Sequence, residues 1–202
     1  DSPIGTVHGD ASMYIGGIRA LLLQSLHPLA MAAVDDFSDY RTDVWGRLAR
    51  TATFIATTTF AVTEHAQQAV DVVRAVHTHV TGTAPDGREY RADDPHLLTW
   101  VHSAEIDSFL IAHELFGKQN LSPSDYDIYV AQAGTVATRL GARGVPTTRA
   151  ALSERIEQFR PELVGTPAAR DVAVFIRNVP LPAVVRPGYR ALVRAAVATL
   201  PR

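Results

Sequence analysis

The chain contains no cysteine, and this absence excludes several kinds of site. Without cysteine there can be no disulfide, no thiolate nucleophile, no iron–sulfur cluster and no cysteine-based zinc site. Any metal ion must therefore be held by histidine or carboxylate side chains. Eight histidines are available for that role: His8, His27, His65, His77, His79, His96, His102 and His113.

Charged and aromatic residues are also sparse. Charged residues make up 20% of the chain, the formal net charge is −2, and lysine and arginine are scattered along the sequence. Nucleic acid binding requires a basic stripe, so we do not expect nucleic acid as a partner. Aromatic residues are only 7% and hydrophobic residues 47% of the 202 positions. This length and composition predict one domain, residues 1–202, with a mainly aliphatic core.

No long apolar run is free of polar residues. The most apolar stretch, residues 15–34, is interrupted by Arg19, Gln24 and His27, which predicts a buried core helix rather than a membrane-spanning one. No signal-peptide pattern precedes it, so we expect a cytoplasmic protein with no integral membrane segment. The chain begins with Asp rather than Met, as a piece of a longer product would.

Start and stop signals for helices recur along the chain and predict an all-α fold. No segment alternates long enough to predict a strand, and residues 82–94 are expected to form a loop with Tyr90 as a candidate anchor. In the first half of the chain, the expected helices run from Asp10 or Ser12 to about Val34 with a kink at Pro28, from Asp43 through Thr58, from Thr63 to Gly82 and from Asp94 to Gly117. In the second half, they run from Ser122 to about Gly141, from Thr147 to near Pro161 and from Thr166 to about Asn178. A last helix, after the prolines at 180, 182 and 187, extends toward Leu200.

Arg47, Thr51 and His77 attract attention because apolar residues surround each of them. They lie on two consecutive amphipathic helices that could face each other across a pocket. A neutral imidazole in an apolar wall is a natural axial ligand for haem iron, and Arg and Thr opposite it could steer oxygen chemistry. Taken alone, the residues also allow simpler roles: a satisfied core histidine, a surface ion pair for Arg47, and a hydroxyl bonded to its own helix for Thr51.

Two further histidines have open alternatives. His27 before Pro28 could bond a backbone carbonyl or line a cavity, and a structural role is favoured. His102 and Glu105 share a helix face, where a surface pair is favoured over contact with a bound ligand. A di-iron bundle would require Glu-x-x-His pairs and a zinc protease HExxH, and the sequence contains neither.

Five segments, in order, resemble one family: LLLQSLHPLAMAAV, GRLARTATF, AVHTHVTG, YRADDPHLLTWVH and RPELVGTPAARD. Together they look like the DUF2236 family, also called the MpaB or rubber oxygenase catalytic domain, from about Gly16 to the C-terminus. Members known as latex clearing proteins are all-α proteins that bind haem b and cleave carbon–carbon double bonds of polyisoprene with dioxygen. The resemblance therefore implies a single-domain multi-helix bundle of the latex clearing protein type.

The same resemblance assigns roles to individual residues. His77, chosen over His79 by the VHxxVxG pattern, would be the proximal iron ligand, with Arg47 and Thr51 near the distal face. Arg50 stands where latex clearing proteins have a lysine, but a guanidinium does not normally lose its proton to bind iron. No carboxylate before Arg47 matches the general base of the family. The other candidate cofactor-binding residues are His27 and His102.

We therefore expect a haem b-dependent oxygenase that uses dioxygen on a small apolar organic substrate. Two alternatives remain open: a non-catalytic helical module that binds an apolar ligand or partner, and a haem-binding protein without oxygenase activity.

Overall fold

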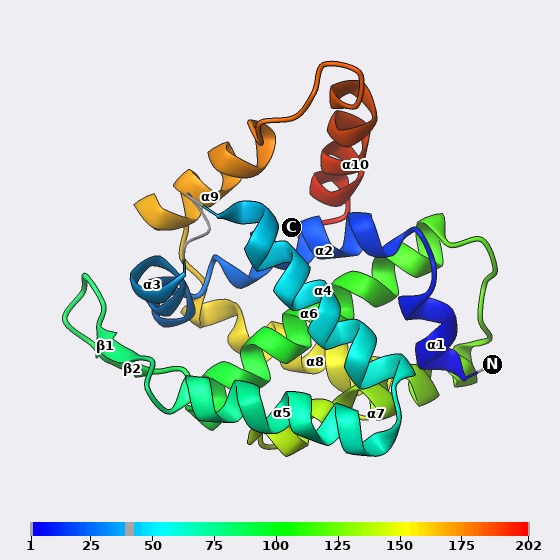
Figure 1. Ribbon diagram of the computed structural model, residues 1–202, viewed down its shortest axis with the longest axis horizontal. Helices are drawn as coiled ribbons and strands as arrows, with labels where there is room; N and C mark the ends of the chain where they lie inside the picture. The colour runs from blue at the N-terminus through cyan, green and yellow to red at the C-terminus, as the bar shows by residue number, and fades with distance from the viewer. Residues whose placement is uncertain (1, 39–42, 202) are drawn as a thin grey trace.

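The computed structural model describes residues 2–38 and 43–201, apart from the side chains of 44 and 45. Helices dominate this part of the chain, so the predicted all-α class is confirmed (Figure 1). The described elements are α1 Pro3–His8, α2 Met13–Gln24, α3 Pro28–Phe37, α4 Val44–Phe60, α5 Thr63–His77, β1 Thr81–Thr83, β2 Glu89–Arg91, α6 Pro95–Phe116, α7 Pro123–Leu140, α8 Arg149–Phe159, the short 3-10 helix η1 Arg160–Glu162, α9 Pro167–Arg177 and α10 Arg186–Ala198.

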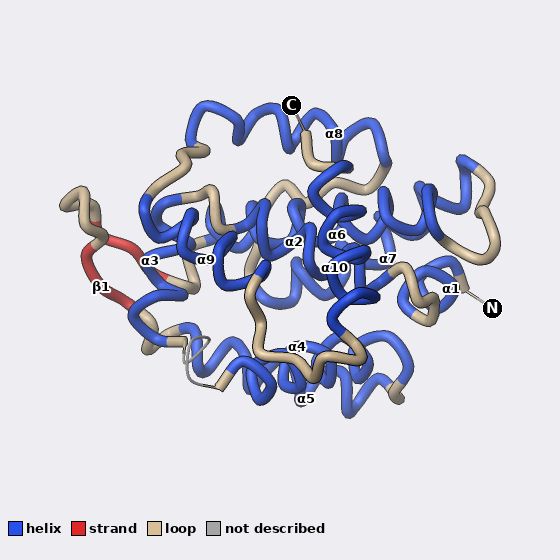
Figure 2. The backbone as a smooth tube through the Cα atoms, turned by 90° about the horizontal axis from the view of Figure 1, so that it is seen from above, coloured by secondary structure: helices blue, strands red, loops and turns tan. Residues whose placement is uncertain are grey.

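Helices α2 and α6 pack against each other at the centre of the bundle. In Figure 2, α8 lies on one side of this central pair and the consecutive helices α4 and α5 lie on the other. The central pair is closely packed: a side chain on Gly16 of α2 would collide with Phe109 of α6. Trp100 of α6 and Phe159 of α8 are among the largest fully buried side chains, and they pack in one cluster with Leu23 of α2.

The central helix α6 has the bounds that the sequence predicts. The Asp94 carboxylate accepts hydrogen bonds from the backbone N–H groups of His96 and Leu97, and Pro95 occupies the first helical position. These features satisfy or remove donors that the helix itself leaves without partners. The helix ends at Phe116, followed by Gly117.

The apolar stretch of residues 15–34 forms two helices rather than one kinked helix, so that prediction is wrong. His27 is extended, with ψ 113°, because proline disfavours the helical conformation in the residue before it. Helices α2 and α3 therefore meet at an angle of 106°. Among the described residues, no single helix is long and apolar enough to cross a membrane, although this bent pair reaches that length and composition when taken together.

Arg19, the charge within that apolar stretch, is buried in the bundle with 3% of its surface exposed. Its guanidinium forms an ion pair with Asp107 of α6 at 2.7 Å and donates hydrogen bonds to Ser108 Oγ and to the carbonyl oxygen of Thr199. One side chain thus connects α2 to the middle of α6 and to the end of α10.

The expected loop of residues 82–94 contains part of a short hairpin, in which β1 pairs antiparallel with β2. Three-residue strands are too short for an alternating pattern, which explains why the sequence does not reveal them. The anchor prediction is confirmed, since Tyr90 is buried and its hydroxyl donates to Asp36 of α3. Helix α5 ends at His77, five residues before the predicted Gly82.

Candidate functional site

Helices α4 and α5 carry three of the predicted site residues. The two helices are joined at Ala61 and Val62 and diverge from that turn in Figure 1, so Arg47 and His77 lie at their separated ends. Asp43 caps α4 as predicted, accepting from the Gly46 N–H. None of the described side chains of α4 is buried, although the helix carries several apolar residues. A helix of this composition normally covers its apolar side.

The three polar candidates on α4 have local partners. Arg47 is half-buried and donates to the Ser38 hydroxyl, which follows α3. Arg50 is exposed and pairs with Asp43 at 3.3 Å. Thr51 is exposed, and its hydroxyl donates to the carbonyl oxygen of Arg47, the self-bonding that the sequence allowed. The structure therefore brings these residues to one end of α4 but does not join them to His77.

His77 is the last residue of α5 and is half-buried. Its Nδ1 atom is buried and has no hydrogen-bond partner within the described part of the chain. Burial lowers the pKa of the ring, and Asp93 opposes this effect, so the neutral form is favoured. His79 differs, because it is exposed and its Nδ1 lies 2.9 Å from the carbonyl oxygen of Ala75. Of these two histidines, only His77 thus has an unused, buried ring nitrogen.

An open hollow of about 370 Å³ lies beside His77. Arg74 and Thr78 border it on the α5 side, and Asp93 borders it from the segment before α6. Gly141, which ends α7 in the left-handed conformation with φ 113°, forms part of the opposite wall. The hollow is therefore accessible from solvent and polar on one side.

His102 of α6 is not part of a surface pair, contrary to the favoured interpretation. Only 8% of its surface is exposed, and its Nε2 atom is buried with no hydrogen-bond partner among the described residues. Burial lowers the pKa of His102 to about 4. Glu105, one turn later, is partly accessible, and burial raises its pKa to about 7. The interior face of α6 thus holds two groups whose neutral forms are favoured by burial.

Sequence reasoning missed a polar chain that connects α4 to α7 through α1, beside this face of α6. His8 of α1 lies between Thr59 of α4 and Tyr129 of α7: its Nδ1 is 2.8 Å from the Thr59 hydroxyl and its Nε2 is 3.3 Å from the Tyr129 hydroxyl. Glu105 is close enough to Tyr129 for its charge to help raise the pKa of that hydroxyl, after the larger effect of burial. The hydrogen bonds join α1, α4 and α7, and no local sequence pattern reports them.

His27 lies in a different place from His77. It stands at the corner between α2 and α3, where its Nε2 is 3.3 Å from the Glu162 carboxylate. His27 does not border the hollow beside His77. The structure thus separates the histidine candidates into the His77 hollow, the α6 interior with His102, and the His27 corner.

Glu105 should make stability depend on pH. The pKa of Glu105 is raised from 4.5 to about 7 in the folded protein, so its favourable contribution is complete below about pH 4.5 and disappears as pH rises toward 7. In the wild type this lowers the free energy of unfolding by at most about 3 kcal/mol between pH 4.5 and 7. We expect Glu105→Gln to abolish that decrease. The check is denaturant unfolding of both proteins at pH 5 and pH 8.

The wild type must be compared with Glu105→Gln, because His8 and His102 change the stability with pH in the opposite direction to Glu105. Their pKa values are lowered to about 4, so their contribution grows as pH rises from about 4 toward 6.5. An equal change of stability with pH in the wild type and in Glu105→Gln would show that Glu105 is ionised freely in the folded protein.

One family of known proteins matches almost the whole chain. The family model described as "ER-bound oxygenase mpaB/B'/Rubber oxygenase, catalytic domain" matches residues 5–202. No curated protein and no solved structure matches the chain significantly. The matched range includes all five segments that carry the resemblance.

Proposed function

The chain belongs to the mpaB/rubber oxygenase catalytic-domain family, and on that premise we propose that it is a haem b-dependent oxygenase acting with dioxygen on a small apolar organic substrate. The observation that carries this proposal is His77, whose half-buried ring borders an open hollow and whose buried Nδ1 has no partner among the described residues. A buried polar atom without a partner is unfavourable, so the His77 ring is not simply a satisfied core histidine.

The chemistry of His77 fits a haem group. Iron in haem takes a neutral imidazole as its axial ligand, and burial keeps His77 neutral. The porphyrin also needs apolar walls. The hollow beside His77 is bordered mainly by polar residues and by none of α4, so the apolar surface would come from its surroundings. Leu48 and Phe54 of α4 and Val73 of α5 are incompletely covered and could supply it. We therefore assign His77 as the residue that would hold the haem iron.

When bound, haem would supply the activation of dioxygen, and the side chains of this chain would orient the reactants. Arg47 keeps its positive charge at all relevant pH values, so it would stabilise negative charge that develops on oxygen. Ser38 holds the Arg47 guanidinium at the start of α4, and Thr51 fixes its own hydroxyl on the Arg47 carbonyl oxygen. Glu105, with its raised pKa, would hold a proton on its carboxyl group near neutral pH.

Arg47→Ala should lower kcat by about 100-fold, since removing one preorganised charged donor typically costs that much. Haem content should stay the same, because Arg47 is not the iron ligand in this proposal. Oxygen uptake with a short isoprenoid hydrocarbon, normalised to the haem absorbance, provides the measurement.

Arg139→Ala is the matched control, because Arg139 is exposed on α7 and bonds only to Gln67 in the described contacts. Its turnover should equal that of the wild type. Equal turnover in Arg47→Ala and Arg139→Ala would remove Arg47 from the proposed site.

A further inference from the structure

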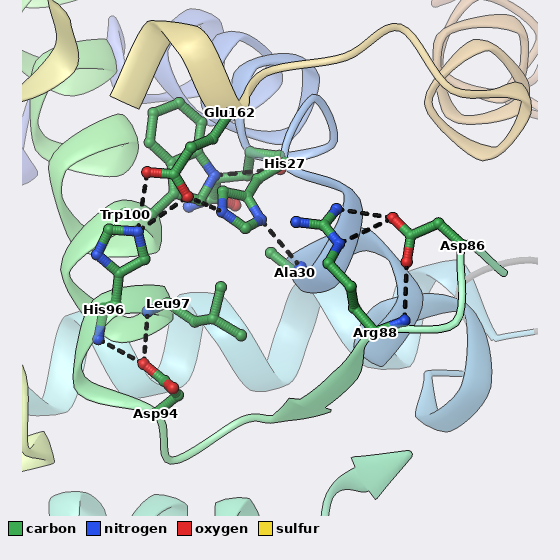
Figure 3. Close-up of polar contacts among 10 residues, drawn as sticks. His27, Ala30, Asp86, Arg88, Asp94, His96, Leu97, Trp100 and Glu162 are labelled. Carbon is green, nitrogen blue, oxygen red and sulfur yellow. Dashed lines mark hydrogen bonds and ion pairs between the residues drawn. The ribbon is translucent and has the colours of Figure 1, made fainter. Parts of the chain in front are cut away.

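His27, His96 and Glu162 meet in space although they are far apart in the sequence (Figure 3). His27 precedes α3, His96 lies in the first turn of α6, and Glu162 ends η1 after α8. One nitrogen from each histidine and one carboxylate oxygen lie within 4.8 Å of one another. The Nε2 atoms of His27 and His96 are 3.3 Å and 2.9 Å from the same oxygen, Oε2 of Glu162. Three potential metal ligands thus converge on one point.

The bundle encloses one of these ligands and supports a second. His27 is almost completely buried, with 1% of its surface exposed, and its ring lies 6.1 Å from the Trp100 ring. The His96 ring lies 4.7 Å from the ring of Phe159. A side chain locked by packing loses little freedom when it binds an ion, so His27 is a preorganised ligand.

The opposite side of the cluster is open. His96 is 55% exposed and Glu162 36% exposed, so an ion can reach the site from solvent. This openness also leaves room for a water molecule as a further ligand.

We propose that His27, His96 and Glu162 bind a divalent transition metal ion of the zinc type through two imidazole nitrogens and one carboxylate oxygen. Imidazole nitrogen favours zinc and its neighbours over magnesium and calcium, which prefer sites made entirely of oxygen. Three protein ligands with an open fourth position are an established arrangement for zinc. None of the three residues borders the hollow beside His77, so this site is independent of the proposed haem site.

The protonation of His27 sets how tightly the site binds. Its Nδ1 accepts a long hydrogen bond, 3.5 Å, from the Ala30 N–H, so the ring proton sits on Nε2 and points at Glu162. A metal ion takes the place of that proton, and the Ala30 bond is lost when the proton moves to Nδ1. Because a 3.5 Å bond is weak, the loss is small. We expect micromolar affinity, weaker than that of a closed structural zinc site.

Calorimetric titration tests the proposal with the whole chain, first stripped with EDTA and then titrated with zinc chloride in a buffer that does not bind metal. We expect one zinc ion per chain. Glu162→Gln and His96→Ala should each weaken binding at least tenfold. Both side chains are accessible, so these variants are expected to fold, unlike a substitution of the buried His27; circular dichroism checks this.

Two variants with intact clusters serve as controls. His79→Ala removes an exposed histidine, and His77→Ala removes the proposed haem ligand, so both should bind zinc as the wild type does. Zinc at 100 times its Kd should also raise the Tm of the wild type by about 5 to 10 °C, because it binds the folded chain and not the unfolded one. Absence of zinc binding, or equal binding in Glu162→Gln and the wild type, would overturn the proposal.

Discussion

His77→Ala is expected to abolish haem binding while the helical bundle stays folded. In the wild type, the His77 ring offers a buried nitrogen that no described protein group uses, and its neutral form is favoured. Removing the ring removes the only proposed bond between protein and iron. The Soret band of haem-reconstituted protein should therefore disappear, while the circular dichroism of the apoprotein and its Tm remain close to the wild-type values, because His77 ends α5 and is only half-buried.

His79→Ala is a close control, since this histidine lies two residues away on the same segment. Its ring is exposed and already bonded to the Ala75 carbonyl oxygen, so the Soret band should persist without it. Loss of the band in His79→Ala and not in His77→Ala would show that the ligand is His79. Wild-type protein that stays colourless after reconstitution with haem would contradict the proposed function and favour a helical module that binds an apolar ligand.

Arg19→Ala should destabilise the protein by about 3 to 5 kcal/mol, the usual result of breaking a buried ion pair by removing one partner. The variant leaves Asp107 without its countercharge and removes the hydrogen bonds to Ser108 and to the Thr199 carbonyl oxygen. Urea denaturation followed by circular dichroism measures the free energy of unfolding.

Arg160→Ala is the comparison for that measurement. The Arg160–Glu157 ion pair is exposed on both sides, so its loss should change the stability far less than the loss of Arg19 does. The double variant Arg19→Met/Asp107→Leu should be more stable than Arg19→Ala, because no unpaired charge remains in the bundle. Equal stability of Arg19→Ala and Arg160→Ala would mean that the Arg19 ion pair contributes no more than a surface pair.

Local signals predict much of the helical fold. The caps at Asp94, Ser122 and Thr166 mark helix starts that the structure confirms, because each of these side chains bonds the backbone within the next three residues. The proline after His27 predicts only a kink within one helix, whereas in the structure the helix ends there and a second helix begins. Helix α1 escapes prediction because six residues give no periodic pattern. Short elements are fixed by contacts with the rest of the fold, which the sequence does not display.

The site is harder to predict, because its groups come from distant segments. The sequence identifies Arg19 as an interruption in an apolar run but does not reveal Asp107, 88 positions later, as its partner. In the same way, His27 and His96 are both visible as histidines, yet their meeting with Glu162 depends on how α3, α6 and α8 pack. The family resemblance adds roles for Arg47, Thr51 and His77 that their spacing does not establish.

The incomplete burial of α4 has a consequence for how the protein would bind a large flat ligand. This helix packs against α5 and α1, and none of its described side chains is buried. Its second half is nevertheless held in place, because Ile55 packs against the core and the Thr59 hydroxyl contacts His8 of α1. A flat apolar ligand bound against α4 would therefore bury side chains that the fold leaves partly exposed, on a helix whose position the bundle already sets.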